Sequence, residues 1–102
     1  MTVLVCEQDN RIIGYAITIV VSTPPVYDPG GPTCLVIEST MAQAADWSVA
    51  GKALLQAVQS HALQQNAVQY VVVCAASQQA KQTALQASGL TIASEWYGGK
   101  ID

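Results

Sequence analysis

The spacing of apolar positions divides the chain into segments, and the first of these have the composition of β-strands. Residues 2–7 form a short apolar run, and residues 12–22 are rich in β-branched side chains, with a polar turn between the two runs. Two such runs joined by a short turn predict an antiparallel hairpin. Gly14 lies inside the second run, which indicates a bulge or the close approach of another backbone.

A segment rich in proline and glycine separates this hairpin from a third predicted strand. Residues 23–32 combine several prolines with a glycine pair, a composition that excludes regular structure. Residues 33–40 follow, and the middle of this run is apolar at consecutive positions. Such a run is typical of a central strand that is covered on both faces.

From residue 48 onward the apolar spacing becomes helical. Side chains at intervals of three and four residues form one stripe, which predicts a helix: Ala50, Leu54, Ala57, Val58, His61 and Gln65. Asp46 or Ser48 is expected to cap its start, since either side chain can accept hydrogen bonds from the first amides of a helix. Asn66 stands where the helix should stop, and residues 69–75 have the β-branched composition of another central strand. A strand, a helix and a strand within about 40 residues predict a parallel pair joined by a right-handed crossover.

The remaining chain predicts one more helix and one more strand. Residues 78–88 have helical spacing, Gly89 suits a left-handed cap, and residues 90–97 have the composition of a strand. The expected order is therefore β-β-β-α-β-α-β, an α/β (α+β) fold with an antiparallel N-terminal hairpin and a central βαβ unit in a mixed sheet. No linker divides the sequence, so we expect a single domain over residues 1–102.

Composition restricts the partners of this domain. Only 11% of the residues are charged and the net charge is −3, so the chain lacks the basic surface that binds nucleic acid. A weakly charged surface opposes self-association little, and we expect a homodimer.

The cysteines and the apolar runs indicate the compartment. The 3 cysteines, Cys6, Cys34 and Cys74, lie singly in apolar runs without a second ligand at metal-binding spacing. This pattern indicates reduced thiols in a cytoplasmic protein and no metal site. We expect no signal peptide, and the apolar runs are too short to cross a membrane.

The junction between the third strand and the first helix is the best place for ligand chemistry. The amides at a helix N-terminus point outward and carry the positive end of the helix dipole, so they suit a phosphate group. Ser48, Ala50 and Gly51 are small enough to let a pyrophosphate approach the backbone, and Lys52 adds a positive charge. Every βαβ unit has such a corner, so a plain loop without a ligand is the other interpretation.

Four segments of the sequence resemble the GNAT N-acetyltransferases. Residues 11–16 are similar to a hairpin strand of that family that contains a glycine, and residues 35–41 to its splayed fourth strand. Residues 49–55 resemble the end of its pyrophosphate loop with the following helix, and residues 80–97 its final helix and the next strand. The resemblance spans most of the chain and implies a short variant without the usual N-terminal strand and helices.

This resemblance implies an N-acetyltransferase that uses acetyl-CoA as its co-substrate. Backbone groups near Thr40, Met41 and Ala42 would hold the acetyl and pantetheine end by strand-like pairing. Ser77 and Gln78, after the next strand, would contact the pantetheine arm. Six consecutive amides would hold the pyrophosphate: those of Trp47, Ser48, Val49, Ala50, Gly51 and Lys52.

Three side chains are candidates for roles beyond cofactor binding. Glu38, three residues before Met41, could act as the base that deprotonates an amine, directly or through water. A carboxylate that faces solvent or a neighbouring donor is the other interpretation of Glu38. Tyr27, in the proline-rich segment, is the candidate for contact with the acceptor, a small-molecule or peptide amine. His61, the only histidine, is expected to be a partly buried structural residue.

A second hypothesis is a GNAT-like domain that does not catalyse and acts in self-association or protein interaction. Asp46 places a negative charge beside the expected pyrophosphate, and Val49 stands where the family pattern has a glycine. Leu85 occupies the position where many members carry a tyrosine acid. A flavodoxin-like fold is a third hypothesis, and the antiparallel opening hairpin argues against it.

Overall fold

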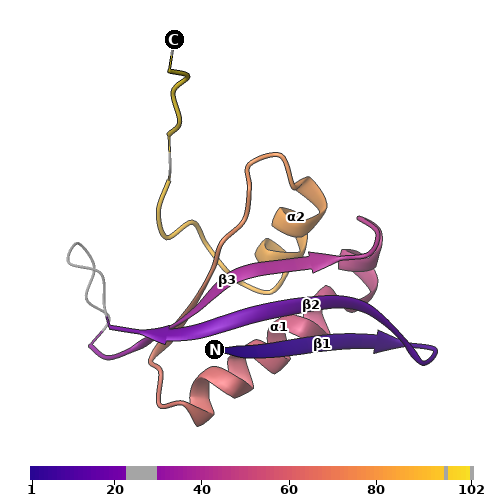
Figure 1. The fold of residues 1–102 in the computed structure, drawn as a ribbon, viewed down its shortest axis with the longest axis horizontal. Helices are drawn as coiled ribbons and strands as arrows, with labels where there is room; N and C mark the ends of the chain where they lie inside the picture. Colours follow the sequence, from indigo (N-terminus) through magenta and orange to yellow (C-terminus); the bar gives the residue numbers. More distant parts are fainter. Residues whose placement is uncertain (23–29, 96, 102) are drawn as a thin grey trace.

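The computed structural model describes residues 1–22, 30–95 and 97–101, which form a four-stranded sheet and two helices (Figure 1). The strands are β1 (Thr2–Gln8), β2 (Arg11–Val21), β3 (Thr33–Met41) and β4 (Gln69–Val72). The helices are α1 (Asp46–Gln64) and α2 (Gln79–Ala87). The sheet order is β1-β2-β3-β4, with β4 parallel to β3 and the other neighbours antiparallel. The mixed α+β architecture, the opening hairpin and the central βαβ unit are confirmed.

The opening hairpin closes through a two-residue turn. Asp9 and Asn10 both have positive φ angles, 53° and 63°, which is the conformation of the turns that match the twist of paired strands. Asp and Asn adopt this conformation more readily than other residues with side chains.

Gly14 on β2 has a different role, because a Cβ there would lie 2.9 Å from the Thr40 carbonyl oxygen. The expected close backbone approach at Gly14 is therefore confirmed.

Helix α1 covers one face of the sheet and contacts all four strands. Strand residues alternate between faces, and those that point toward α1, such as Ala16 and Val36, are each 1% exposed. They pack against Leu54 and Val58 of α1 in one hydrophobic cluster. The backbone of α2 lies close to α1 and not to any of the strands. Helix α2 therefore extends the helical layer beside α1.

The opposite face of the sheet is apolar and open. Val3, Val5 and Ile37 are 54%, 50% and 39% exposed. Val3 pairs with Ile17 and Val5 with Tyr15, so these apolar side chains share one face. The expectation that β3 is covered on both faces is wrong for the described residues, because both described helices lie in one layer.

Two helix ends agree with the sequence and one start does not. Asn66 has a φ of 59° and Gly89 a φ of 85°, and these left-handed residues follow α1 and α2 as expected. Helix α1, however, begins at Asp46, and neither candidate side chain caps it. The Asp46 carboxylate instead accepts from the amide of Gln43 at 3.0 Å, because the chain already forms a turn over residues 43–46.

The last expected strand is wrong for the part of the chain that the structure describes. Residues 90–95 and 97 contain no strand, and residues 91–95 and 97–101 are exposed. Figure 1 shows this C-terminal segment running away from the sheet and the helices. A strand needs a neighbouring edge to pair its amides and carbonyls, and this segment lies beside none.

Candidate functional site

Strands β3 and β4 pair over half of β3 and then part. Their register runs from Thr33 with Gln69 to Val36 with Val72, and the Val73 amide donates to the Val36 carbonyl at 3.1 Å. β3 continues to Met41 with β2 as its only partner among the described strands. A gap therefore opens beside the second half of β3, which we call the splay.

A bulge lies where the splay begins. Val36 pairs with Thr18 and Glu38 with Ile17, so Ile37 is an extra residue in β3. A bulge bends and twists its strand, which turns the second half of β3 away from β4. Paired residues share a face of the sheet, so Glu38 lies on the open face.

Beyond the bulge, the backbone of β3 presents groups to the splay. The Ala42 amide donates to the carbonyl of Ile13 at 2.7 Å, and Gly14 pairs with Met41. Because successive residues of a strand turn their backbone groups to opposite sides, Thr40 and Ala42 face β2 and Met41 faces the splay. Of the three backbone positions expected to hold an acyl group, Met41 is the one that the register turns toward the splay.

Lys81 of α2 reaches into the splay. Its side chain is 3% exposed, and its Nζ donates to the carbonyls of Ser39 at 3.0 Å and Val73 at 2.9 Å. The ammonium also lies 5.5 Å from the centre of the Trp47 ring, within the range of a cation–π interaction. Lys81 thus joins the two strands where they no longer pair with each other.

The environment of Lys81 affects its ionisation. Burial lowers the pKa of Lys81, and the Cys74 thiol and the Glu38 carboxylate act in the opposite direction. The sequence interpretation missed this residue, although a signal was present. Lys81 precedes Ala84 and Leu85 by three and four residues, so it falls on the apolar stripe of α2 rather than on its polar side.

A groove of about 510 Å³ runs between the first turns of α1 and one face of α2. Its walls are Ala44, Ala45, Trp47, Ser48 and Lys52 on one side and Ala80, Thr83, Ala84, Ala87 and Ser88 on the other. Trp47 lines the groove and also contacts Lys81. The groove and the splay therefore meet at Trp47.

Comparison of this structure with solved structures identifies the fold. It superposes on aminoglycoside N-acetyltransferase AAC(6')-Iy in complex with CoA with a TM-score of 0.78 and 14% identity, over 98% of this chain and 75% of that one. The wild-type protein TTHA1254 of Thermus thermophilus gives a TM-score of 0.70 and 16% identity, over 97% and 69%. A predicted acetyltransferase of Clostridium acetobutylicum with acetyl-CoA gives 0.68 and 16%, over 94% and 61%.

The chain has the fold of the GNAT acetyltransferases. By sequence, no family model matches it, and no curated protein is detectably similar. The GNAT fold is therefore visible in the arrangement of strands and helices, while the sequence is only 14% to 16% identical to these structural neighbours.

Within this GNAT fold, some of the first amides of α1 already donate hydrogen bonds to backbone carbonyls. The amides of Trp47 and Ser48 donate to the carbonyls of Ala44 and Ala45, both at 3.2 Å. Among the described residues, the amides of Ala44 and Ala45 have no partner. The outward-pointing amides thus lie one turn earlier than the expected set of residues 47–52, because the chain begins to coil at Gln43.

The other residues expected around the pyrophosphate differ in exposure. Val49 is 65% exposed, Ala50 is half-buried, and Lys52 is exposed beside the groove. Gly51 is buried, and a Cβ there would lie 3.2 Å from the Cβ of Ala84. Gly51 therefore allows the two helices that form the groove to pack closely.

Two further expected residues lie in the turn between β4 and α2. Ser77 and Gln78 are exposed, and the Gln78 side-chain oxygen accepts from the Ala75 amide at 3.1 Å. This turn follows Val73 and so lies beyond the end of the paired strands. Tyr27, the expected acceptor contact, lies outside the described residues.

Glu38 forms a polar pair on the open face. The Tyr15 hydroxyl donates to the Glu38 carboxylate at 2.8 Å, and this hydrogen bond raises the pKa of Tyr15. Glu38 and Ser39 are adjacent in sequence but belong to opposite faces, since Glu38 pairs with Ile17 and Ser39 with the buried Ala16. A carboxylate and a buried lysine thus approach the splay from opposite sides.

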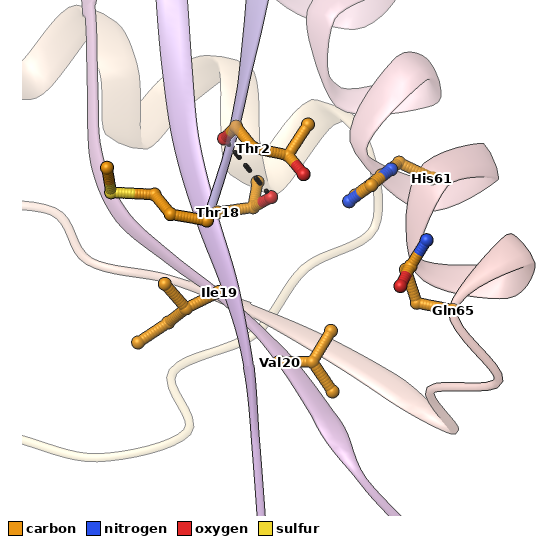
Figure 2. A pocket seen from close by; sticks show the side chains of 7 residues that line it. Thr2, Thr18, Ile19, Val20, His61 and Gln65 are labelled. Atoms are coloured by element: carbon orange, nitrogen blue, oxygen red, sulfur yellow. Dashed lines mark hydrogen bonds between the residues drawn. The ribbon is translucent and has the colours of Figure 1, made fainter.

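His61 lies away from the splay, near the C-terminal end of α1. It is half-buried and lines a separate hollow of about 240 Å³ with Thr2, Thr18 and Gln65 (Figure 2). On the strand side of this hollow, the Thr18 hydroxyl donates to the carbonyl of its register partner Thr2 at 3.4 Å. In the described part of the chain no cluster of side chains suits a metal ion, and no helix is long and apolar enough to span a membrane.

Proposed function

We propose that the protein binds acetyl-CoA and transfers the acetyl group to an amine, either a small molecule or a peptide. The observation that carries this proposal is the splay beside β3, with the groove between α1 and α2 that meets it at Trp47. The AAC(6')-Iy enzyme was solved with CoA and with a bisubstrate analogue of CoA and acetylneamine. Those complexes support a coenzyme site in a fold of this kind.

The coenzyme follows the groove toward the splay. Its pyrophosphate lies at the amides of Ala44 and Ala45 with Lys52 beside it, because exposed amides at a helix N-terminus favour anions. The pantetheine arm passes Trp47, with Ser77 and Gln78 on its far side. The thioester then lies beside Met41, whose amide stabilises the charge that develops on the carbonyl oxygen.

Transfer proceeds by direct attack of the neutral amine on the thioester carbonyl carbon. A carbon–nitrogen bond forms, the carbon–sulfur bond breaks, and CoA leaves with the electron pair of that bond on sulfur. The amine nitrogen loses one proton to the Glu38 carboxylate, directly or through water, and the sulfur finally takes up a proton to give the CoA thiol. The Tyr15 hydroxyl orients this carboxylate.

Calorimetric titration and a thiol-release assay test the proposal. We expect saturable binding of acetyl-CoA and release of CoA thiol when an amine panel is added. Glu38→Gln should retain binding and slow transfer by about 10²- to 10⁴-fold. Lys52→Met should weaken coenzyme binding, while Lys100→Met removes the same charge from the exposed C-terminal segment and serves as the control. Absence of binding heat at millimolar acetyl-CoA, with folded protein, would contradict the proposal.

A second candidate function is self-association through the open face of the sheet, with a second copy of this chain as the partner. The exposed apolar side chains of Val3, Val5 and Ile37 on that face favour it, and the low net charge of −3 opposes it little. Sedimentation equilibrium tests this. We expect a dimer that Val5→Lys dissociates, with Val68→Lys as a control at an exposed site outside the strands. A monomer at all concentrations overturns it.

A further inference from the structure

The ammonium of Lys81 is buried, and its hydrogen-bond partners in the described part of the chain are uncharged. At 3% exposure it has two carbonyl partners, Ser39 and Val73, and among the described residues no carboxylate forms an ion pair with it. A charged lysine is almost never fully buried unless it is paired. An ammonium also has three N–H donors, so these two hydrogen bonds leave one donor for a further acceptor.

Ser39 supplies a second, independent sign of an acceptor that is missing. The residue is 6% exposed, and its buried side-chain oxygen has no hydrogen-bond partner among the residues that the structure describes. Leaving a buried hydroxyl unpartnered costs roughly 1–3 kcal/mol, so most such groups in folded proteins have partners. The hydroxyl belongs to the β3 residue whose carbonyl accepts from the Lys81 ammonium, so both donors are found beside the splay.

We infer that Lys81 and Ser39 bind the carbonyl oxygen of the acyl thioester. This inference rests on the acyl-CoA binding proposed above and adds two side-chain donors to the Met41 amide. The Lys81 ammonium and the Ser39 hydroxyl can each donate a hydrogen bond to an oxygen atom, and both are buried where the two strands part. Lys81 is thereby the residue that distinguishes an acyl-CoA from a coenzyme without an acyl oxygen.

The position of Lys81 favours an acyl oxygen over a phosphate. A pyrophosphate is large and highly charged, and it fits the groove itself, which is lined by the exposed residues Ala44, Ala45 and Lys52. Lys81 is instead buried outside the lining of the groove, with its ammonium 5.5 Å from the centre of the Trp47 ring and between carbonyls of the two strands. The two lysines therefore bind different ends of the same ligand.

A comparison of two coenzyme probes isolates the carbonyl oxygen. Acetyl-CoA and S-ethyl-CoA have the same chain length, but the thioether lacks the oxygen. We expect the wild-type protein to bind acetyl-CoA at least about tenfold more tightly than S-ethyl-CoA in calorimetry, the scale of one charged hydrogen bond. Lys81→Met should bring this ratio close to one. Lys52→Met should weaken the binding of both probes and leave the ratio unchanged.

Ser39→Ala keeps the inference testable even if Lys81→Met does not fold. Because the Ser39 hydroxyl has no partner in the free protein, we expect this variant to be as stable as the wild type and still to lose part of the ratio. Nuclear magnetic resonance of the Lys81 side-chain nitrogen gives a second signature, a shift with acetyl-CoA that S-ethyl-CoA does not produce. A purely structural lysine would respond equally to both probes.

The outcomes separate the two proposals. If the wild type binds neither probe, acyl-CoA binding and this inference both fail. If it binds both probes equally, or if Lys81→Met and Ser39→Ala retain the full ratio, the protein is a coenzyme-binding protein and the roles of Lys81 and Ser39 are overturned.

Discussion

The two halves of β3 differ in what surrounds them. The first half, up to Val36, pairs with strands on both sides, and its Val36 belongs to the hydrophobic cluster that packs against α1. The second half keeps one strand partner and borders a gap that contains the Lys81 ammonium and the unpartnered Ser39 hydroxyl. The first half stabilises the fold, and the second half gathers buried polar groups beside the gap.

The difference shows how one strand can both stabilise the fold and contribute polar groups to a candidate site. Ladder hydrogen bonds satisfy the backbone of the paired half, so its side chains need only to pack. In the splayed half no described strand pairs with Met41 on the side away from β2, and the Lys81 side chain of α2 joins the two strands instead. Polar groups without partners are costly in a folded protein, so their concentration in one half of one strand marks the functional region.

The largest effect should come from the core beneath the paired half. Leu54 is 2% exposed and belongs to the cluster that contains Val36. Leu54→Ala should lower the free energy of unfolding by about 2 to 5 kcal/mol, because it leaves a cavity under the sheet. Urea denaturation measures this loss. Leu63→Ala on the same helix, at a side chain that is 75% exposed, should change it by less than about 0.5 kcal/mol. Equal losses in both variants would contradict the packing described here.

A smaller loss is expected where β2 approaches the splayed half. A Cβ at Gly14 would lie 2.9 Å from the Thr40 carbonyl oxygen and would also overlap the Met41 sulfur. Gly14→Ala should therefore destabilise the protein by about 1 to 3 kcal/mol and, because Met41 must move, weaken acetyl-CoA binding as well. Gly98→Ala, where no atom lies within 4 Å of the added Cβ, is the control. A variant that loses stability but binds acetyl-CoA normally would show that Met41 does not contribute to acetyl-CoA binding.

A third substitution tests the pairing of β3 with β4 itself. The Gln69 side-chain amide donates to the Thr33 hydroxyl at 2.7 Å, at the first pair of the parallel ladder. Gln69→Ala should lower the free energy of unfolding by about 0.5 to 1.5 kcal/mol, the net value of one hydrogen bond, and leave acetyl-CoA affinity unchanged. Gln59→Ala, at an exposed position of α1, should have no effect in the same denaturation experiment. A change of affinity in Gln69→Ala would show that the two halves are not independent.

The same division separates what the sequence predicts from what it misses. The paired elements follow from short-range patterns. The hairpin, the crossover helix and the stops at Asn66 and Gly89 are signalled by residues close together in the chain. Regular elements of this kind depend on local propensity and on apolar spacing, which a single sequence contains.

The prediction that was wrong and the features that were missed depend on contacts between distant segments of the chain. The expected strand after Gly89 has strand composition but no neighbouring edge among the described residues. The splay exists because Ile37 bulges against β2, and a bulge leaves no clear mark in the apolar pattern. Lys81 appeared as an isolated charge, because only the fold brings α2 within reach of Ser39, 42 positions earlier in the chain.

The smallest expected effect is a change in how stability depends on pH. Burial lowers the pKa of Lys81 below its ordinary value of 10.5, so the unfolded chain holds this proton at pH values where the folded protein has begun to release it. In that interval the unfolded state binds more protons, and the free energy of unfolding rises with pH. Lys81→Met lacks this contribution, so the stability of the wild type relative to the variant should rise as pH approaches 10.5.

The other titratable groups around Lys81 do not reverse this rise with pH in the stability of the wild type relative to the variant. Cys74 faces it after β4 and Glu38 faces it from β3. Burial raises the pKa of Cys74 and Lys81 opposes that rise, so the variant should lose more stability at alkaline pH, which adds to the same difference. Urea denaturation at several pH values above neutrality measures it, with Ser39→Ala as a control that removes no titratable group. A flat or falling difference would mean that Lys81 is no more desolvated in the folded protein than in the unfolded chain, and the splayed half would then hold no buried charge for a ligand to meet.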